Sequence, residues 1–347
     1  MGHCLQTKIT DNGKISIFPR ILPMLGFLLA GLIAFTPNSS LKIEFVDTEG
    51  GGATLIITPT GESILIDCGN PGNRDAERIA KAAKKLGLER IDHLVVTHWH
   101  LDHYGGAGTL TRKIPVVKFW DRGIPESLPD DLTNFPVLIA AYKEVSRGKR
   151  TTLKAGDVLP LKQKEGSPPV KLSCVCASGV VRKDIKAPLG ASETPSLREP
   201  DPSDNALSLG FVLEYGDFRF LDLGDLTWNK ESLLVYPKDL LGRIDVYQST
   251  HHGLEVSNHP DLMKQVSPTI AVFNNGPRKG AHPRVIRDLR RLENFEEIFQ
   301  LHKNLTAPDS DNAPSTHVAN PSEACEALGI NIEVDAAAKK YIVKVGD

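Results

Sequence analysis

Apolar side chains recur in the first part of the chain with the periods of strands and helices. Residues 41–46 alternate apolar and polar positions, whereas residues 53–58 and 63–67 are mostly apolar. Turns containing glycine or proline separate these runs, so the pattern predicts an antiparallel meander of three strands. Apolar positions then recur at helical spacing over residues 73–86. Gly87 follows, where a left-handed residue commonly ends a helix.

Later segments repeat the unit of an apolar run that ends in polar residues. Residues 91–97, 244–249 and 269–273 are predicted strands, and each runs into a loop with histidine or asparagine. A hairpin is predicted over residues 206–223, and a final strand pair over residues 330–345. This mixture of strands and helices indicates an α/β protein.

Residues 121–203 have the weakest pattern. A helix is predicted near residues 132–146 and a strand over residues 171–177. Residues 181–203 are rich in proline, serine and charge, which predicts a long exposed loop. We therefore interpret residues 121–203 as a loop-rich insertion in the domain.

The N-terminal segment contains an uncharged apolar run at residues 21–35, and three basic residues precede it. The run is shorter than the roughly 20 residues that cross a bilayer, and it is typical of the apolar core of a secretory signal. No clear cleavage site follows, so residues 1–36 are interpreted as a signal peptide or an uncleaved anchor. We expect an exported protein, periplasmic or extracellular, that meets the membrane only through this segment.

Composition excludes some classes of partner. The chain has 347 residues, with 41 basic and 43 acidic side chains and a formal net charge of −2. This balance excludes non-specific electrostatic binding of nucleic acid along the protein surface. Nucleic acid remains an option only as a substrate bound at one local site. The five cysteines do not form a disulfide framework. The oligomeric state stays open.

The most informative stretch is His98-Trp99-His100-Leu101-Asp102-His103, directly after a predicted strand. His98 and His100 are two residues apart, so in extended backbone they point to one side. Asp102 and His103 open the next helix and can point back to the same place. We predict that His98 and His100 bind one metal ion and that Asp102 and His103 bind a second, because imidazole and carboxylate are ligands of catalytic zinc.

Two neighbouring metals need a bridging carboxylate and a further ligand. Asp225 ends a predicted strand and is the candidate bridge, with helix capping as the alternative. His251 and His252 follow the next strand, and one of them is expected to complete the second metal. The sequence does not decide which.

The pattern His98-x-His100-x-Asp102-His103, with the later Gly224-Asp225 and the paired histidines, resembles the metallo-β-lactamase superfamily. Residues 41–69, Asp204-Asn205 and the late His282-Pro283 narrow the resemblance to the ComEC-like hydrolase branch and its stand-alone secreted relatives. The similarity spans about residues 41–300. It implies an αββα sandwich of two mixed β-sheets flanked by helices, over residues 41–347.

The sequence departs from the superfamily between the motif and the bridge. No histidine occurs from Tyr104 to Gly224, which argues against a true β-lactamase or glyoxalase. The ComEC-like branch is similar in this respect. Asp204 or Asn205 occupies the place of the missing ligand, so one of these two residues, or water, is expected to complete the first metal site. Gly52 also stands where the branch often has an aspartate.

The resemblance implies two divalent metal ions, zinc first, with manganese or iron as alternatives. A metal-bridged hydroxide would cleave a phosphoester of a small molecule or nucleic acid. Asp102 and His252 are assigned to catalysis as well as to metal binding. His282 is expected either to donate to a substrate oxygen or only to cap a helix. Asp67 is expected either to be the carboxylate partner of a ligand histidine or to be only a buried aspartate of a turn.

Two alternatives from other functional classes remain. One is hydrolysis of a lactone, thioester or other carboxylic ester. The other is a non-catalytic metal-binding module of an uptake or surface assembly.

Overall fold

The computed structural model describes residues 15–19, 40–183 and 194–346 and contains two mixed β-sheets that pack face to face. The apolar run at residues 21–35 and most of the expected signal segment therefore lie outside the described residues.

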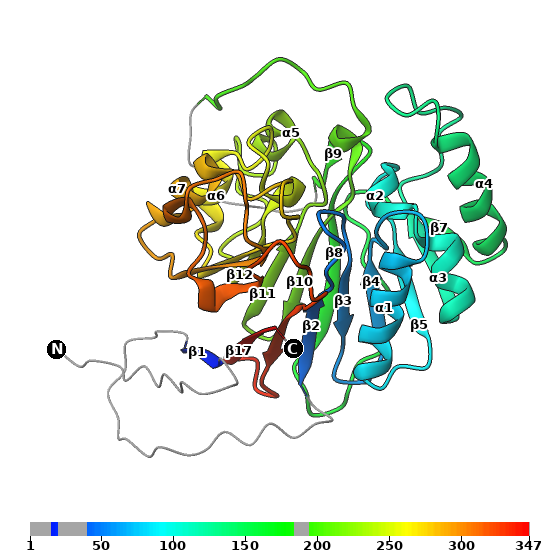
Figure 1. Cartoon of the computed structure of the whole chain (residues 1–347), viewed down its shortest axis with the longest axis horizontal. Helices are drawn as coiled ribbons and strands as arrows, with labels where there is room; N and C mark the ends of the chain where they lie inside the picture. Colours follow the sequence, from blue (N-terminus) through cyan, green and yellow to red (C-terminus); the bar gives the residue numbers. More distant parts are fainter. Residues whose placement is uncertain (1–14, 20–39, 184–193, 347) are drawn as a thin grey trace.

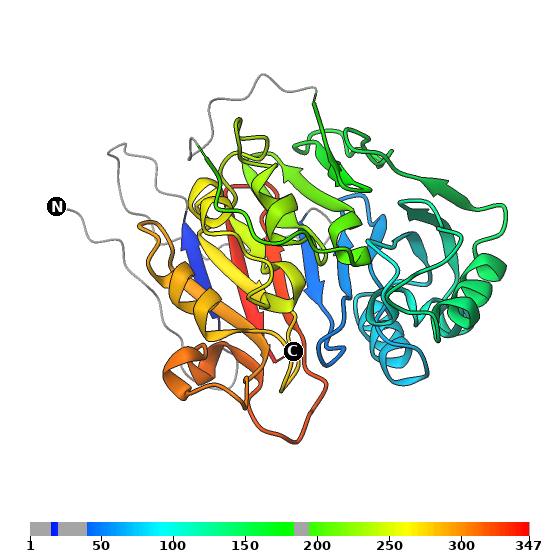
Figure 2. The same cartoon turned by 90° about the horizontal axis from the view of Figure 1, so that it is seen from above.

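Within the described residues, the first sheet has nine strands. Their spatial order is β1 (Ile15–Pro19), β17 (Lys340–Val345), β16 (Ile330–Val334), β2 (Leu41–Phe45), β3 (Thr54–Ile57), β4 (Ser63–Ile66), β5 (Ile91–Val95), β6 (Val116–Asp121) and β7 (Arg150–Thr152). The strands from β1 to β4 pair antiparallel, and β4 to β7 pair parallel. In Figure 2 the blue strand β1 lies beside the red strand β17.

The second sheet has eight strands among the same residues. Their order is β15 (Val318–Asn320), β14 (Glu297–His302), β13 (Ile270–Phe273), β12 (Val246–Gln248), β11 (Phe218–Asp222), β10 (Gly210–Tyr215), β8 (Val170–Ala177) and β9 (Val180–Val181). The five strands from β11 to β15 are parallel, whereas β8 to β11 are antiparallel.

Helices cover the outer face of each sheet, as Figure 1 shows. On the first sheet lie α1 (Arg74–Lys85), α3 (Ala107–Lys113) and α4 (Phe135–Val145), which pack on its apolar outer side chains. On the second lie α5 (Trp228–Ser232), α6 (Pro260–Val266) and α7 (Pro283–Arg290). The short helix α2 (Leu101–Tyr104) begins inside the histidine motif.

The central core fills the space between the two sheets. Alternate side chains of each sheet point inward, including Ile43, Phe45 and Ile64 from the first sheet and Phe211 and Phe220 from the second. Both faces of each sheet are thus buried, which confirms the expected αββα sandwich.

Most of the predicted elements are present. The meander is β2 to β4, the first helix is α1, and Gly87 has the expected positive φ of 79°. The insertion over residues 121–203 contains more structure than a loop, since α4 and β8 appear where a helix and a strand were predicted. β8 pairs along most of β10. The strands β6 and β14 had no counterpart in the sequence analysis.

Within the described ranges, no helix has the length and apolar character that crossing a membrane requires.

Replacing Phe220 by alanine should test the central core. Phe220 is 1% exposed, and its ring meets the Phe45 ring edge-on with centroids 5.9 Å apart. The cavity should lower the free energy of unfolding by about 3–5 kcal/mol, measured by urea denaturation. Leu132→Ala is the control, because Leu132 is 70% exposed and should change stability by less than about 0.5 kcal/mol. Equal losses in the two variants would contradict this account of the core.

Candidate metal centre

The predicted ligands lie in loops that follow strands of the two sheets. His98 to His103 follow β5, Asp225 follows β11, and His251 and His252 follow β12. In each sheet the carboxyl ends of neighbouring parallel strands meet at one edge. The fold therefore brings together side chains more than a hundred residues apart.

Asp225 lies at the centre of this convergence. Its Oδ2 atom is 3.2 Å from His103 Nε2, 3.3 Å from the Nε2 atoms of His251 and His252, and 3.9 Å from His98 Nε2. The Asp225 side chain is 4% exposed. One buried carboxylate oxygen thus faces four imidazole nitrogens.

The ligand atoms form two overlapping groups that share His103. His98, His103 and Asp225 make the first, and Asp102, His103 and His252 make the second, with all ligand atoms of a group within 4.8 Å of one another. Asp102 Oδ2 lies 3.7 Å from His103 Nε2 and 3.5 Å from His252 Nε2. The structure thus places His252 in a ligand group and His251 only beside Asp225.

An unusual turn makes both consecutive histidines reach Asp225. His251, His252 and Gly253 have φ values of 54°, 55° and 83°, three left-handed residues in a row. In extended backbone, neighbouring side chains would point to opposite sides. Left-handed conformations are costly for non-glycine residues and are held by their surroundings. His251 Nδ1 is 3.3 Å from Ser257 Oγ, and His252 Nδ1 is 3.3 Å from the Asn274 carbonyl oxygen.

Asp67 orients the motif from behind, as the sequence predicted. Its Oδ2 accepts hydrogen bonds from His103 Nδ1 at 2.7 Å and from the Thr97 hydroxyl at 2.7 Å. Its Oδ1 accepts from the Thr97 backbone N–H at 2.8 Å. In the neutral form of His103 that donates through Nδ1, Nε2 directs its lone pair at the cluster.

His98 gives a direct test of whether a metal fits. Its Nδ1 lies 3.0 Å from the Thr97 hydroxyl, while Nε2 is buried and has no hydrogen-bond partner among the described residues. A buried imidazole nitrogen without a hydrogen-bond partner, close to a carboxylate and to other imidazoles, is the kind of atom that binds a divalent metal ion. The donor set is that of zinc sites.

The protonation states of His98 and Asp225 agree with this fit. Burial, reinforced by neighbouring His103, holds the pKa of His98 well below its usual value, so this imidazole is neutral and able to bind a metal. Burial alone would raise the pKa of Asp225. The charges of His103, His251 and His252 outweigh it and hold that pKa well below its usual value. The bridging candidate is therefore ionised.

His100 lies beside the cluster rather than within either ligand group. Its ring centroid is 4.8 Å from that of His98, and its Nε2 donates to Asp130 Oδ2 at 2.8 Å. This bond leaves Nδ1 as the nitrogen for a metal.

Asp204 does not join the cluster. Its Oδ2 accepts from the Trp99 backbone N–H at 2.6 Å, and its Oδ1 contacts the Arg122 guanidinium. Both oxygens are used to hold the histidine loop. The Asp204 backbone N–H also donates to Asp130 Oδ2 at 2.9 Å, so Asp130 links Asp204 to His100.

His282 begins α7 as its cap. Its Nδ1 accepts from the Arg284 N–H at 3.3 Å, and its side chain is 37% exposed near Glu255. Of the two roles expected for His282, the structure shows the contact of a helix cap. His259 caps α6 in the same way, and Trp99 packs against Tyr104 and Tyr142.

Lys279 is a site residue that sequence reasoning missed. Its Nζ contacts Asp102 Oδ2, and its side chain is 41% exposed. It belongs to the loop between β13 and α7, and a lysine among glycines and prolines gives no sequence signal of its own. Lys279 places a positive charge at the solvent-facing rim of the cluster.

The loop of Gly50, Gly51 and Gly52 packs tightly on the motif. A Cβ atom at Gly51 would lie 2.5 Å from the Asp102 carbonyl oxygen, and one at Gly52 would lie 2.9 Å from His103 Nδ1. A side chain at Gly52 would also meet Asp67 at 3.0 Å. The glycine at position 52, where an aspartate was expected, therefore leaves room for the Asp67–His103 pair.

Comparison with known proteins agrees with this geometry. The family model of the metallo-beta-lactamase superfamily matches residues 47–173. Recombination protein 2 of Haemophilus influenzae is 24% identical over 262 residues, which cover 74% of this chain and 27% of that protein. ComE operon protein 3 of Bacillus subtilis is 26% identical over 263 residues, covering 71% of this chain and 30% of the relative.

Among solved structures, the metallo-beta-lactamase fold protein YhfI from Bacillus subtilis is 10% identical with a TM-score of 0.43. The match covers 75% of this chain and 96% of that one. Residues 47–173 are thus similar to the metallo-beta-lactamase superfamily, and the chain resembles its ComEC-like branch. It spans less than a third of the length of the two curated relatives.

Asp67→Asn should weaken metal binding without unfolding the protein. The amide keeps the size of the side chain but loses the charge that orients His103, so metal affinity should fall about 10–100-fold. Competition with a chromophoric chelator measures the affinity. Asp92→Asn is the control, because Asp92 lies on the same sheet and bonds Ser63. Unchanged affinity in Asp67→Asn would contradict the orienting role.

Proposed function

We propose that this chain is an exported, dinuclear metal-dependent phosphoesterase. The observation that carries the proposal is the convergence of four imidazole Nε2 atoms on the buried carboxylate of Asp225. Export rests on the apolar run at residues 21–35, which lies outside the described residues.

The proposed ligand sets combine the two groups of atoms with the sequence motif, which adds His100. His98, with His100 through Nδ1, would hold one ion, and Asp102, His103 and His252 would hold the other, with Asp225 shared. Divalent zinc bound there would supply a nucleophile at neutral pH and stabilise negative charge on the substrate. Asp67, Asp130 and Asp204 keep the histidine loop in place.

Lys279 favours a phosphoester over a neutral ester as the substrate. Its ammonium group stands at the rim, where an anionic substrate would approach Asp102. An ammonium can bind a phosphate oxygen through a charge-assisted hydrogen bond. A lactone or a simple carboxylic ester offers no negative oxygen in its ground state, so it gains less from this charge.

Asp225→Ala should weaken metal binding and abolish hydrolysis. Without the shared carboxylate, the metal content should fall by about one or two ions per chain. Hydrolysis of bis-p-nitrophenyl phosphate should fall to the background rate. Metal analysis and the release of nitrophenol measure the two effects. Asp309→Ala is the control, since the Asp309 side chain is 86% exposed. Full metal content without phosphodiester turnover in the parent protein would redirect the assignment to carboxylic esters and lactones.

Lys279→Met should act selectively on anionic substrates. Losing one charge-assisted hydrogen bond, worth about 1.5–3 kcal/mol, should lower kcat/KM for bis-p-nitrophenyl phosphate about 10–100-fold. Any turnover of neutral p-nitrophenyl acetate should change little. Arg278→Met is the matched control, because Arg278 is an exposed cation in the same loop that pairs with Glu323. An equal loss on both substrates would show that Lys279 acts on the metal centre and not on the substrate.

A further inference from the structure

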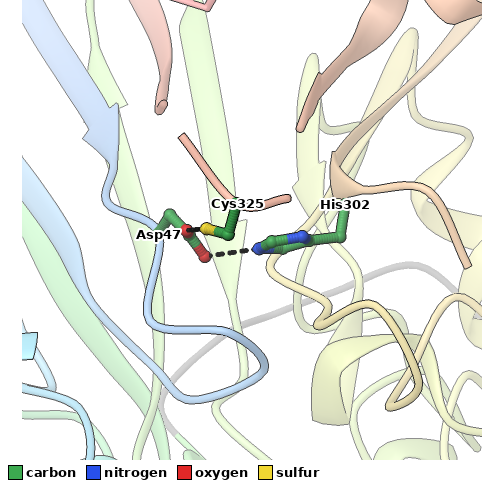
Figure 3. Close-up of side chains that lie close together, drawn as sticks. All are labelled: Asp47, His302 and Cys325. Carbon is green, nitrogen blue, oxygen red and sulfur yellow. Dashed lines mark hydrogen bonds and ion pairs between the residues drawn. The ribbon is translucent and has the colours of Figure 1, made fainter. Parts of the chain in front are cut away.

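A second cluster of ligand-type side chains lies outside the candidate metal centre. Asp47 follows β2, His302 ends β14, and Cys325 lies between β15 and β16. Figure 3 shows the three side chains pointing toward one another. His302 Nε2 is 2.7 Å from Asp47 Oδ1, and the Cys325 thiol donates to Asp47 Oδ2 at 3.0 Å.

We propose that Asp47, His302 and Cys325 form a further binding site for one divalent transition-metal ion of the zinc class. Sulfur, imidazole nitrogen and carboxylate oxygen are the three ligand types that zinc takes in proteins. The three ligand atoms lie within 4.8 Å of one another. Bonds of about 2.0–2.3 Å around one tetrahedral ion place ligand atoms roughly 3.3–3.7 Å apart, so shifts of about 1 Å at each contact suffice.

The present hydrogen bonds mark the place of the ion. The thiol proton now lies between Cys325 Sγ and Asp47 Oδ2, and a second proton lies between His302 Nε2 and Asp47 Oδ1. Binding of M²⁺ would release the thiol proton to water and move the imidazole proton from Nε2 to Nδ1, leaving a thiolate, a neutral imidazole and a carboxylate. The ligand charges then balance those of the ion.

Arg78 places a positive charge next to the proposed cation site, which would oppose metal binding unless that charge is neutralised. Its guanidinium bonds Asp47 Oδ2 at 2.9 Å and Cys325 Sγ at 3.5 Å. It also pairs with Glu49 at 2.8 Å, which neutralises it. Arg78 is thus an outer partner that fixes the carboxylate and the sulfur in their places, a common arrangement behind metal ligands.

The site has access to solvent. A cavity of about 630 Å³ borders it, and its lining includes Asp47, Arg78, Glu326 and Ala327. Cys325 is partly exposed, while Asp47 and His302 are at most 1% exposed. A metal ion can enter from the cavity, and water can take a fourth position.

A nucleophilic cysteine fits the same residues less well. A thiol activated by histidine needs the imidazole at the sulfur, whereas His302 bonds the opposite oxygen of Asp47. Burial and the hydrogen bond to Asp47 raise the pKa of Cys325 to about 11, which disfavours the thiolate until a cation is bound.

Cobalt(II) titration of the metal-stripped full chain tests the site without any activity assay. Cobalt bound to a thiolate gives a near-ultraviolet charge-transfer band, and the ligands of the candidate metal centre contain no sulfur. The parent protein should show this band, with a final intensity that corresponds to one thiolate-bound ion per chain. Asp225→Ala should keep it, so failure of the metal centre would not mask the result.

Cys325→Ser should lose the charge-transfer band while keeping the visible cobalt bands of the histidine-rich centre, which would show that it is folded. Cys4→Ser is the matched control and should retain the band. A parent protein without the band would overturn the proposal. So would a band that persists in Cys325→Ser, since another cysteine would then be the ligand.

Discussion

The site depends on one buried carboxylate oxygen that faces four imidazole nitrogens. Removing a carboxylate from water is costly unless charges or hydrogen bonds compensate, so Asp225 requires its histidines to be close. They come from separate loops of both sheets, and each loop is fixed by its own means. Asp67 orients His103, a left-handed turn aims His251 and His252, and Asp204 holds the backbone at Trp99.

Sequence reasoning found the features that depend on local pattern. Strand periods located β2 to β5 and β10 to β13, and the rule that polar residues gather at strand ends found His98 to His103, Asp225 and His252. It missed β14 because Glu297–His302 neither alternate regularly nor form an unbroken apolar run. It missed Lys279 because that residue reaches Asp102 only through the tertiary fold.

Asp204 also shows that sequence order alone does not predict which atoms a side chain contacts. Its place in the chain, between the motif and Asp225, suggested a ligand, and the structure does bring it to the motif. The side chain then bonds Arg122 and the Trp99 backbone instead of joining a ligand group. Sequence order predicted the neighbourhood, whereas the direction of the carboxylate depends on a buried arginine that no motif marks.

The loop of Asp47 to Gly52 and the loop of Asn275 to Lys279 connect the two clusters. The first begins at Asp47, beside His302 and Cys325, and ends with Gly52 against His103. The second begins at Asn275, whose amide donates to the His302 carbonyl oxygen at 2.7 Å, and ends with Lys279 at Asp102. Neither loop is a helix or a strand, so contacts at the ends of each loop must hold its residues in position against the metal centre. An ion at Asp47, His302 and Cys325 would fix one end of both loops. It would thereby help to hold Gly52 against His103 and Lys279 at Asp102.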